Sequence, residues 1–310
     1  DIDSLVKKRT TGLRQPEKAP KVEKATRKQY PDGFEAYGAD ALRFTLASMA
    51  GMGRNIKLSV DRVAGYRNFG TKLWNAARFM EMNGCAPAAD FDPAKCSVGV
   101  NQWIISEASM AIKTVSEHID NYRFSDAADA LYKFAWGNYC DWYLELIKPV
   151  FNGDNADAQA ETRAASAWVY DQILKLLHPF MPFISEELWQ NTGKRETDLI
   201  VAPWPEHDLG LDYFTANTDV NWVIELVSNI RSVRAEMNVP PAKKAPMVVV
   251  GANDELTAAE VALMNELARE QRMKMQLEKV RGQYEYVIID CPPSLNLLTV
   301  NAMVAAHSVL

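Results

Sequence analysis

Residues 60–82, VDRVAGYRNFGTKLWNAARFMEM, carry the most informative pattern in this sequence. Apolar side chains recur there every three or four positions, at Val63, Tyr66, Phe69, Leu73, Ala76 and Met80. That spacing matches the period of an α-helix and places the apolar side chains along one stripe. The stretch therefore predicts a core-facing helix of about six turns.

Comparable helical patterns lie on both sides of this stretch. They predict helices over residues 40–50, 104–119, 124–146, from the acidic loop 152–157 to residue 177, 185–190 and 219–237. Pro179 and Pro182 separate two of these helices, and Pro240 and Pro241 end the last. Long amphipathic helices joined by short turns are typical of antiparallel bundles, so the predicted fold class is mainly α.

The first thirty residues differ from the rest in charge and in proline content. Pro16, Pro20 and Pro31 predict a segment that is mostly loop, with regular structure beginning near Tyr37. Nine Lys or Arg stand against four acids between residues 1 and 30, a local excess of five. A solvated flexible arm and an arm that contacts phosphate groups both fit this excess.

The C-terminal part of the chain has the pattern of α/β structure. Residues 247–250 form an apolar strand pattern, and a helix is predicted from Thr257. Beyond a charged segment, residues 284–290, 291–294 and 295–306 read as a strand, a Pro-Pro loop and an apolar helix. We predict a small α/β segment after the bundle and then a truncated β-loop-α-β tail.

Composition narrows the classes of protein further. A chain of 310 residues with 48% hydrophobic and 24% charged positions can bury a sizeable core. The formal net charge of -6 argues against a generally basic nucleic-acid binder, although it averages over a patchy distribution, and no apolar run is long enough for a membrane helix. We expect a cytoplasmic protein. Its four cysteines, Cys85, Cys96, Cys140 and Cys291, have no metal-ligand spacing, so free or buried thiols are expected.

Several blocks together resemble the valyl-tRNA synthetase family. They are YGADALRFTLA at 37–47, GRNI at 53–56, GYRNF at 65–69, KLWNAARF at 72–79, DWYLELIKP at 141–149, LHPFMPFISEELW at 177–189 and IRSVRAEMNVPP at 230–241. Leucyl and isoleucyl enzymes share the HPF-to-ELW pattern, whereas the pairing of YRNF with KLWNAARF, together with DWYLELIKP, favours the valyl enzymes. The resemblance covers about residues 1–268.

The resemblance implies a division of the chain into four parts. Residues 1–58 would end the synthetase catalytic core, and residues 59–212 would form the anticodon-binding helical bundle. Residues 213–268 would hold the C-terminal helix and a small α/β segment. Residues 269–310 would be foreign to the synthetase.

The resemblance also implies which residues contact tRNA. Lys72 and Phe79 match positions at which the family contacts anticodon nucleotides, with Arg62 as a weaker candidate. The same helix carries cations and amides suited to a single-stranded RNA loop, at Arg67, Asn68, Asn75 and Arg78. Weaker tRNA contacts are expected at Arg54, Lys57, Arg231 and Arg234.

Structural explanations compete with these roles. Phe79 equally fits a core aromatic side chain, and Lys72 fits an ordinary surface lysine. Arg231 and Arg234 have the spacing for local ion pairs with Glu236.

Activation of valine in this family uses HIGH and KMSKS motifs, and neither occurs in this sequence. We therefore assign no catalytic or metal-binding residue and expect the chain alone to hold no cofactor and to be inactive. The complete synthetase would use ATP and Mg²⁺ to attach valine. The expected partner is tRNA carrying a valine anticodon, with no membrane and no DNA.

Residues 277–310, which include YVIIDCPPSLNLLTVNAMVAA at 286–306, are similar to a fragment of the ParA-like partitioning ATPases. In those ATPases the aspartate that ends the strand, here Asp290, lies near the Mg-nucleotide. No Gly-rich lysine loop occurs in this sequence to hold phosphates, so Asp290 is expected to be inert. A join near residues 268–274 suggests a recombined or misassembled reading frame. A partitioning ATPase and a stand-alone RNA-binding protein are the alternative functions.

Overall fold

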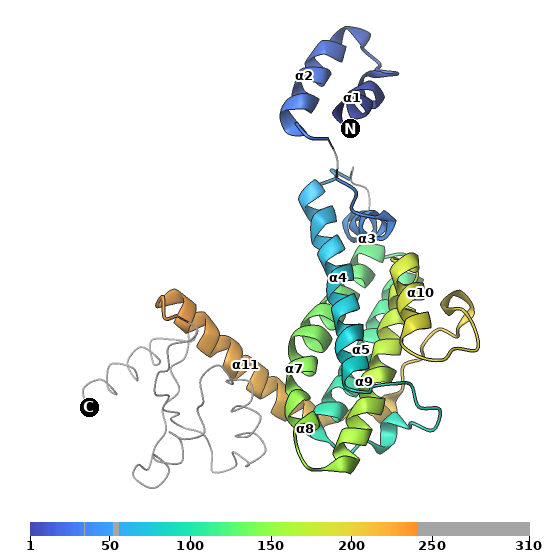
Figure 1. Ribbon diagram of the computed structural model, residues 1–310, viewed down its shortest axis with the longest axis vertical. Helices are drawn as coiled ribbons and strands as arrows, with labels where there is room; N and C mark the ends of the chain where they lie inside the picture. The colour runs from blue at the N-terminus through green and yellow to red at the C-terminus, as the bar shows by residue number, and fades with distance from the viewer. Residues whose placement is uncertain (34, 52–55, 241–310) are drawn as a thin grey trace.

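The computed structural model describes residues 1–33, 35–51 and 56–240, and every regular element in those ranges is helical (Figure 1). The α-helices are α1 Ile2–Thr10, α2 Ala19–Gln29, α3 Ala39–Met49, α4 Val60–Met82, α5 Gly99–Asp120, α6 Phe124–Tyr132, α7 Leu144–Leu146, α8 Lys148–Phe151, α9 Ala156–Leu177, α10 Pro182–Asn191 and α11 Phe214–Glu236. A π-helix, Lys133–Tyr143, joins α6 to α7. The prediction of a mainly α bundle is confirmed, whereas the predicted strands, the α/β tail and Cys291 lie outside the described residues.

In the bundle, α9 packs against both α4 and α5, with α3 and α10 against one end (Figure 1). The stripe predicted on α4 faces this core: five of its six side chains are buried, and Tyr66 is half-buried. Aromatic rings fill the end beneath α3. The ring centroid of Phe44 lies 5.6 Å from that of Phe69 and 5.9 Å from that of Phe180. Edge-on contacts of this kind add to the stabilisation that burial alone provides.

The prolines of the N-terminal segment led us to expect mostly loop, and this prediction is wrong. α1 and α2 pack against each other as a helical hairpin around the buried Val6 and Thr26, and Arg27 joins them through a 2.8 Å ion pair to Asp3. Pro16 and Pro20 both lie in the first turn of a helix, where the missing N–H would have no partner in any case. Pro16 and Pro20 therefore mark helix starts, whereas Pro31 lies in a turn. The basic side chains of the hairpin remain exposed.

Other predicted helices are confirmed with shifted ends. α11 begins at Phe214 rather than at Asp219, and α10 begins at Pro182 rather than at Ser185. The segment predicted as one α-helix over residues 124–146 is continuous but changes to π geometry in its middle. Cys85, Cys96 and Cys140 are buried free thiols, as expected, and burial raises the pKa of Cys140 to about 12.

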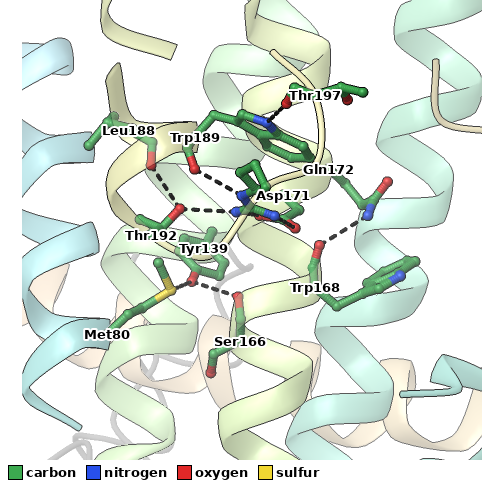
Figure 2. Close-up of polar contacts among 11 residues, drawn as sticks. Met80, Tyr139, Ser166, Trp168, Asp171, Gln172, Leu188, Trp189, Thr192 and Thr197 are labelled. Atoms are coloured by element: carbon green, nitrogen blue, oxygen red, sulfur yellow. Dashed lines mark hydrogen bonds and ion pairs between the residues drawn. The ribbon is translucent and has the colours of Figure 1, made fainter. Parts of the chain in front are cut away.

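A buried ion pair ties the loop after α10 to α9 (Figure 2). Arg195 donates two hydrogen bonds of 2.7 Å to the carboxylate of Asp171, and its Nε donates to the carbonyl of Trp189 at 2.9 Å. Its guanidinium also lies 3.7 Å from the centre of the Trp189 ring. Burial raises the pKa of Asp171, and the two Arg195 bonds oppose that rise. Arg195 is therefore the main group that opposes the effect of burial on this carboxylate, with a smaller contribution from Lys175.

Replacing Arg195 with methionine should lower the free energy of unfolding by about 3–5 kcal/mol, because the buried Asp171 would lose its counter-charge. Urea unfolding followed by circular dichroism measures the change. Arg123→Met is the matched control, since Arg123 pairs with Asp126 at 2.6 Å on the exposed surface. That control should cost less than about 1 kcal/mol. Equal costs for the two variants would contradict the importance of the buried pair.

Candidate nucleic-acid interface

The predicted contact residues of α4 occupy two edges of the helix. Asn68, Lys72, Asn75 and Phe79 are spaced by four, three and four residues, so they lie along one edge. Arg67 and Arg78 share the adjoining edge, and both are exposed. Asn68 and Asn75 are exposed, whereas Lys72 and Phe79 are half-buried. The structure therefore groups four of the predicted residues on a single surface, which we call the Lys72 edge.

Lys72 is held in place by two groups from the π-helix. Its Nζ donates a 2.6 Å hydrogen bond to Oδ1 of Asp141 and lies 5.4 Å from the centre of the Trp136 ring. The two charged side chains keep 35% and 42% of their surface exposed. The position of the ammonium is stabilised by two interactions, a cation–π contact with the indole ring and a charge-assisted hydrogen bond to the carboxylate. Lys72 thus has a fixed position, unlike an ordinary surface lysine.

The π geometry explains why Trp136 and Asp141 both face Lys72. In a π-helix the hydrogen bond runs from residue i to residue i+5, so residues five apart come onto the same side. In an α-helix the side chains that share a face are three or four apart. Trp136 and Asp141 are five apart within Lys133–Tyr143. π-Helices are rare and often occur at functional sites.

Buried hydrogen bonds anchor the inner side of the π-helix. Tyr139 donates to the backbone carbonyl of Ser166 at 3.1 Å, and Tyr143 donates to Oδ1 of Asn101 at 2.9 Å. Burial raises the pKa of both hydroxyls, so they stay protonated and can donate. Asn138 donates a 2.6 Å bond to Glu107 on α5. Burial raises the pKa of Glu107, and the bonds it accepts partly offset this rise.

Phe79 lies at the far end of the Lys72 edge, partly against the core. Its ring centroid is 6.4 Å from that of Phe151, and Nζ of Lys148 lies 5.9 Å from the ring centre. Lys148 also pairs with Glu145 at 2.5 Å. Phe79 therefore packs partly against the core and also contributes to the surface, where Lys148 lies near its ring.

The remaining predicted residues are more scattered. Arg62, near the start of α4, and Lys57 are exposed, while Arg54 and Asp290 lie outside the described residues. Arg231 on α11 lies 5.3 Å from the centre of the Trp142 ring. Arg234 donates to the carbonyl of Pro240 at 2.8 Å. This contact joins α11 to the π-helix through Arg231, which spacing within α11 had not predicted.

Arg67 faces a different feature of the molecule. It helps to line an apolar groove of about 740 Å³ between α3, α4 and α10, together with Trp74 and Phe183. Arg67 is thereby separated from the Lys72 edge. Sequence reasoning grouped all the polar residues of α4, but the helix places them on two surfaces.

The site also includes residues that sequence reasoning did not select, namely Trp136, Asp141 and Lys148. Asp141 and Lys148 stand inside the quoted block DWYLELIKP. Their charges alone could have marked them as candidates for the site, but the pairing of Lys72 with Asp141 joins positions 69 residues apart. Nothing in the local spacing indicates such a contact.

Known proteins are similar to most of this chain. Residues 101–249 match the family described as the anticodon-binding domain of tRNA ligase. The chain is 51% identical to valine–tRNA ligase of Rhizobium meliloti (strain 1021) over 271 residues, which cover 85% of this chain and 28% of that protein. It is 55% identical to valine–tRNA ligase of Mesorhizobium japonicum over 226 residues, covering 72% of this chain and 24% of that protein.

The chain belongs to the valyl-tRNA synthetase family. It spans less than a third of the length of the family members that it matches. A crystal structure of the ternary complex of Agrobacterium radiobacter K84 agnB2 LeuRS-tRNA-LeuAMS is also similar, with a TM-score of 0.44, 22% identity and coverage of 56% of this chain and 20% of that one.

Residues 209–310 of this synthetase-family chain match a second family, described as an AAA domain. The match includes the tail that resembled ParA-like ATPases and overlaps the anticodon-binding match at residues 209–249. It does not favour the alternative of a partitioning ATPase. Among the described helices, none is both long and apolar enough to cross a membrane.

Glu107→Gln should stabilise this synthetase-family chain at neutral pH, because it removes a half-buried charge while keeping an oxygen to accept from Asn138. The folded-state pKa of Glu107 is raised, so the wild-type chain is stabilised as pH falls through that pKa towards the ordinary value. The advantage of the variant should therefore shrink in acid. Urea unfolding across this pH range measures it.

Glu117→Gln on the exposed side of α5 is the control for that series. An advantage of Glu107→Gln that stayed constant with pH, or that the control shared, would contradict the assignment to buried charge.

Proposed function

We propose that this chain is the anticodon-binding part of a valine–tRNA ligase and that its Lys72 edge contacts the anticodon loop. The observation that carries the proposal is the fixed position of Lys72 between Asp141 and Trp136, in line with Asn68, Asn75 and Phe79. The π-helix that holds Lys72 lies within the region that matches the anticodon-binding family.

The chemistry of this edge suits unpaired nucleotides. Bases of a single-stranded loop are recognised by aromatic stacking and by hydrogen bonds to their edges. The ring of Phe79 offers a stacking face, the two asparagines offer both donors and acceptors, and Lys72 offers donors. Arg78 on the adjoining edge of α4 is exposed and supplies a charge for phosphate groups.

Residues farther from the Lys72 edge would contribute less specific contacts. We assign phosphate contacts to Arg62, Lys57, Arg231 and Arg234, and to the exposed basic side chains of the α1–α2 hairpin. Arg67 is assigned a secondary role, since it faces the apolar groove.

The complete protein would use ATP and Mg²⁺ to attach valine to its tRNA in the cytoplasm. The names of the relatives support this reaction. Recognition of the valine anticodon is the part of the reaction that we assign to the present chain, and no catalytic residue is assigned to it.

The proposal is tested by measuring binding of the chain to tRNA with a valine anticodon and to the same tRNA altered only at the anticodon. Lys72→Ala should weaken binding to the valine tRNA by about 1–3 kcal/mol and reduce the preference between the two tRNAs. Measurements at low and moderate salt separate base contacts from phosphate contacts. Lys113→Ala, an exposed lysine of α5, is the control. Equal binding of both tRNAs by the wild-type chain would refute the proposal.

Phe79→Leu keeps an apolar side chain against Phe151 but removes the ring. If Phe79 stacks on an anticodon base, this variant should lose about 1–3 kcal/mol of tRNA binding while its thermal unfolding changes little. Unfolding affected as strongly as binding would instead make Phe79 a core residue only.

A further inference from the structure

Asp141 is an unexpected residue at an RNA-binding surface. Its side chain is 42% exposed and lies on the π-helix, beside Lys72 of the Lys72 edge. A negative charge there repels phosphate groups, and a carboxylate can only accept hydrogen bonds. Pairing with Asp141 also offsets the positive charge of Lys72, because the two charges of the pair cancel. A surface that bound only the RNA backbone would be improved by removing Asp141.

Nucleobase edges pose a different requirement. A base edge presents donors beside acceptors, so its complement must also present both. The Asp141 carboxylate and the Lys72 ammonium, 2.6 Å apart, form such a complement. The ammonium has three N–H donors and uses one on Asp141, while the second oxygen of the carboxylate remains to accept.

The pair is also rigid enough to discriminate between bases. The lysine rests over Trp136, whose ring stacks on Tyr132 with centroids 5.6 Å apart. The Asp141 backbone belongs to the π-helix, which Tyr139 and Tyr143 anchor on its buried side. Groups held in place lose little conformational entropy when they bind, which favours selective recognition.

We propose that Asp141 is a specificity-determining residue that accepts a hydrogen bond from the exocyclic amino group of an anticodon base while Lys72 donates to the adjacent ring acceptor. The inference rests on the proposed function, because it refines the role of the same edge. Adenine and cytosine carry an exocyclic amino group, whereas guanine and uracil carry a carbonyl oxygen at that position. A carbonyl oxygen placed against the carboxylate would be repelled. The pair therefore selects an amino base over a keto base.

Valine codons begin with guanine and uracil, so the two anticodon positions common to all valine tRNAs hold adenine and cytosine. Both are amino bases, as the proposal requires. The test therefore uses four tRNAs: the valine tRNA, adenine→guanine at one shared position, cytosine→uracil at the other, and an unrelated anticodon. Each is titrated with the wild-type chain, Asp141→Asn and Asp141→Glu, and thermal unfolding of each variant confirms the fold.

Asp129→Asn is the matched control variant. Asp129 pairs with Lys133 at 2.7 Å, and both side chains are more exposed than those of the Lys72–Asp141 pair. The variant removes the same charge next to the same kind of partner, away from the Lys72 edge. It reports the general effect of one less negative charge on RNA binding.

The wild-type chain should prefer the amino base at one of the two positions by about tenfold or more. Asp141→Asn should reduce that preference to a few-fold, because an amide both donates and accepts, while its affinity for the unrelated tRNA stays equal or rises. Asp141→Glu keeps a carboxylate and should retain part of the preference. Asp129→Asn should leave the preference unchanged.

Three results would overturn the inference: a full preference in Asp141→Asn, a loss of affinity shared equally by all four tRNAs, or the same relaxation in Asp129→Asn. These results differ from failure of the proposed function, in which the wild-type chain itself would not distinguish the valine tRNA from the unrelated one.

Discussion

Three buried tyrosine hydroxyls fix how the central helices lie against one another. Tyr170 on α9 donates to the backbone carbonyl of Leu73 on α4 at 2.8 Å, Tyr139 donates to the carbonyl of Ser166, and Tyr143 donates to Asn101. A buried hydroxyl without a partner is costly, so sliding one helix along another by a turn would break these bonds and leave the hydroxyls unsatisfied. The apolar core drives the helices together without specifying their relative height. The hydroxyls specify the relative height of the helices, and thereby the distance between the Lys72 edge and the π-helix.

The π-helix has a less favourable backbone geometry than an α-helix, but it places particular side chains where the core and the Lys72 edge need them. An eleven-residue π segment is long for a geometry that usually forms a single turn. Its inner face supplies buried tyrosines to the core and its outer face supplies Trp136 and Asp141 to Lys72. An α-helix would turn one of the two outer side chains away. The packing that stabilises the unusual backbone is therefore the same packing that builds the candidate site.

The sequence predicted the fold more completely than the site. The apolar period of α4, α5 and α9 determines which faces are buried, so these helices and their buried faces follow from the order of the residues alone. The prediction of a loop at the N-terminus was wrong because a proline can either begin a helix or break one. Only the residues of the following turn distinguish the two cases. The change to π geometry has no periodic signal in a segment rich in aromatic residues. On α4, Lys72 and Phe79 could be selected by resemblance, but Asp141 could not, since its role depends on a contact between distant parts of the chain. The four-part division of the chain stays a prediction.

A chain with a formal charge of -6 does not bind RNA by charge alone. Attraction of phosphate groups is independent of sequence and weakens steeply with salt, so a protein that must distinguish anticodons gains little from a uniformly basic surface. The Lys72 edge follows a different principle: amides, an aromatic ring and an ion pair alternate along one helix edge, with Arg78 beside them. Mixed groups of this kind are complementary to base edges and stacking faces rather than to phosphates. The acidic balance of the chain and its proposed role in reading RNA are therefore compatible, because discrimination comes from the geometry of a few fixed side chains.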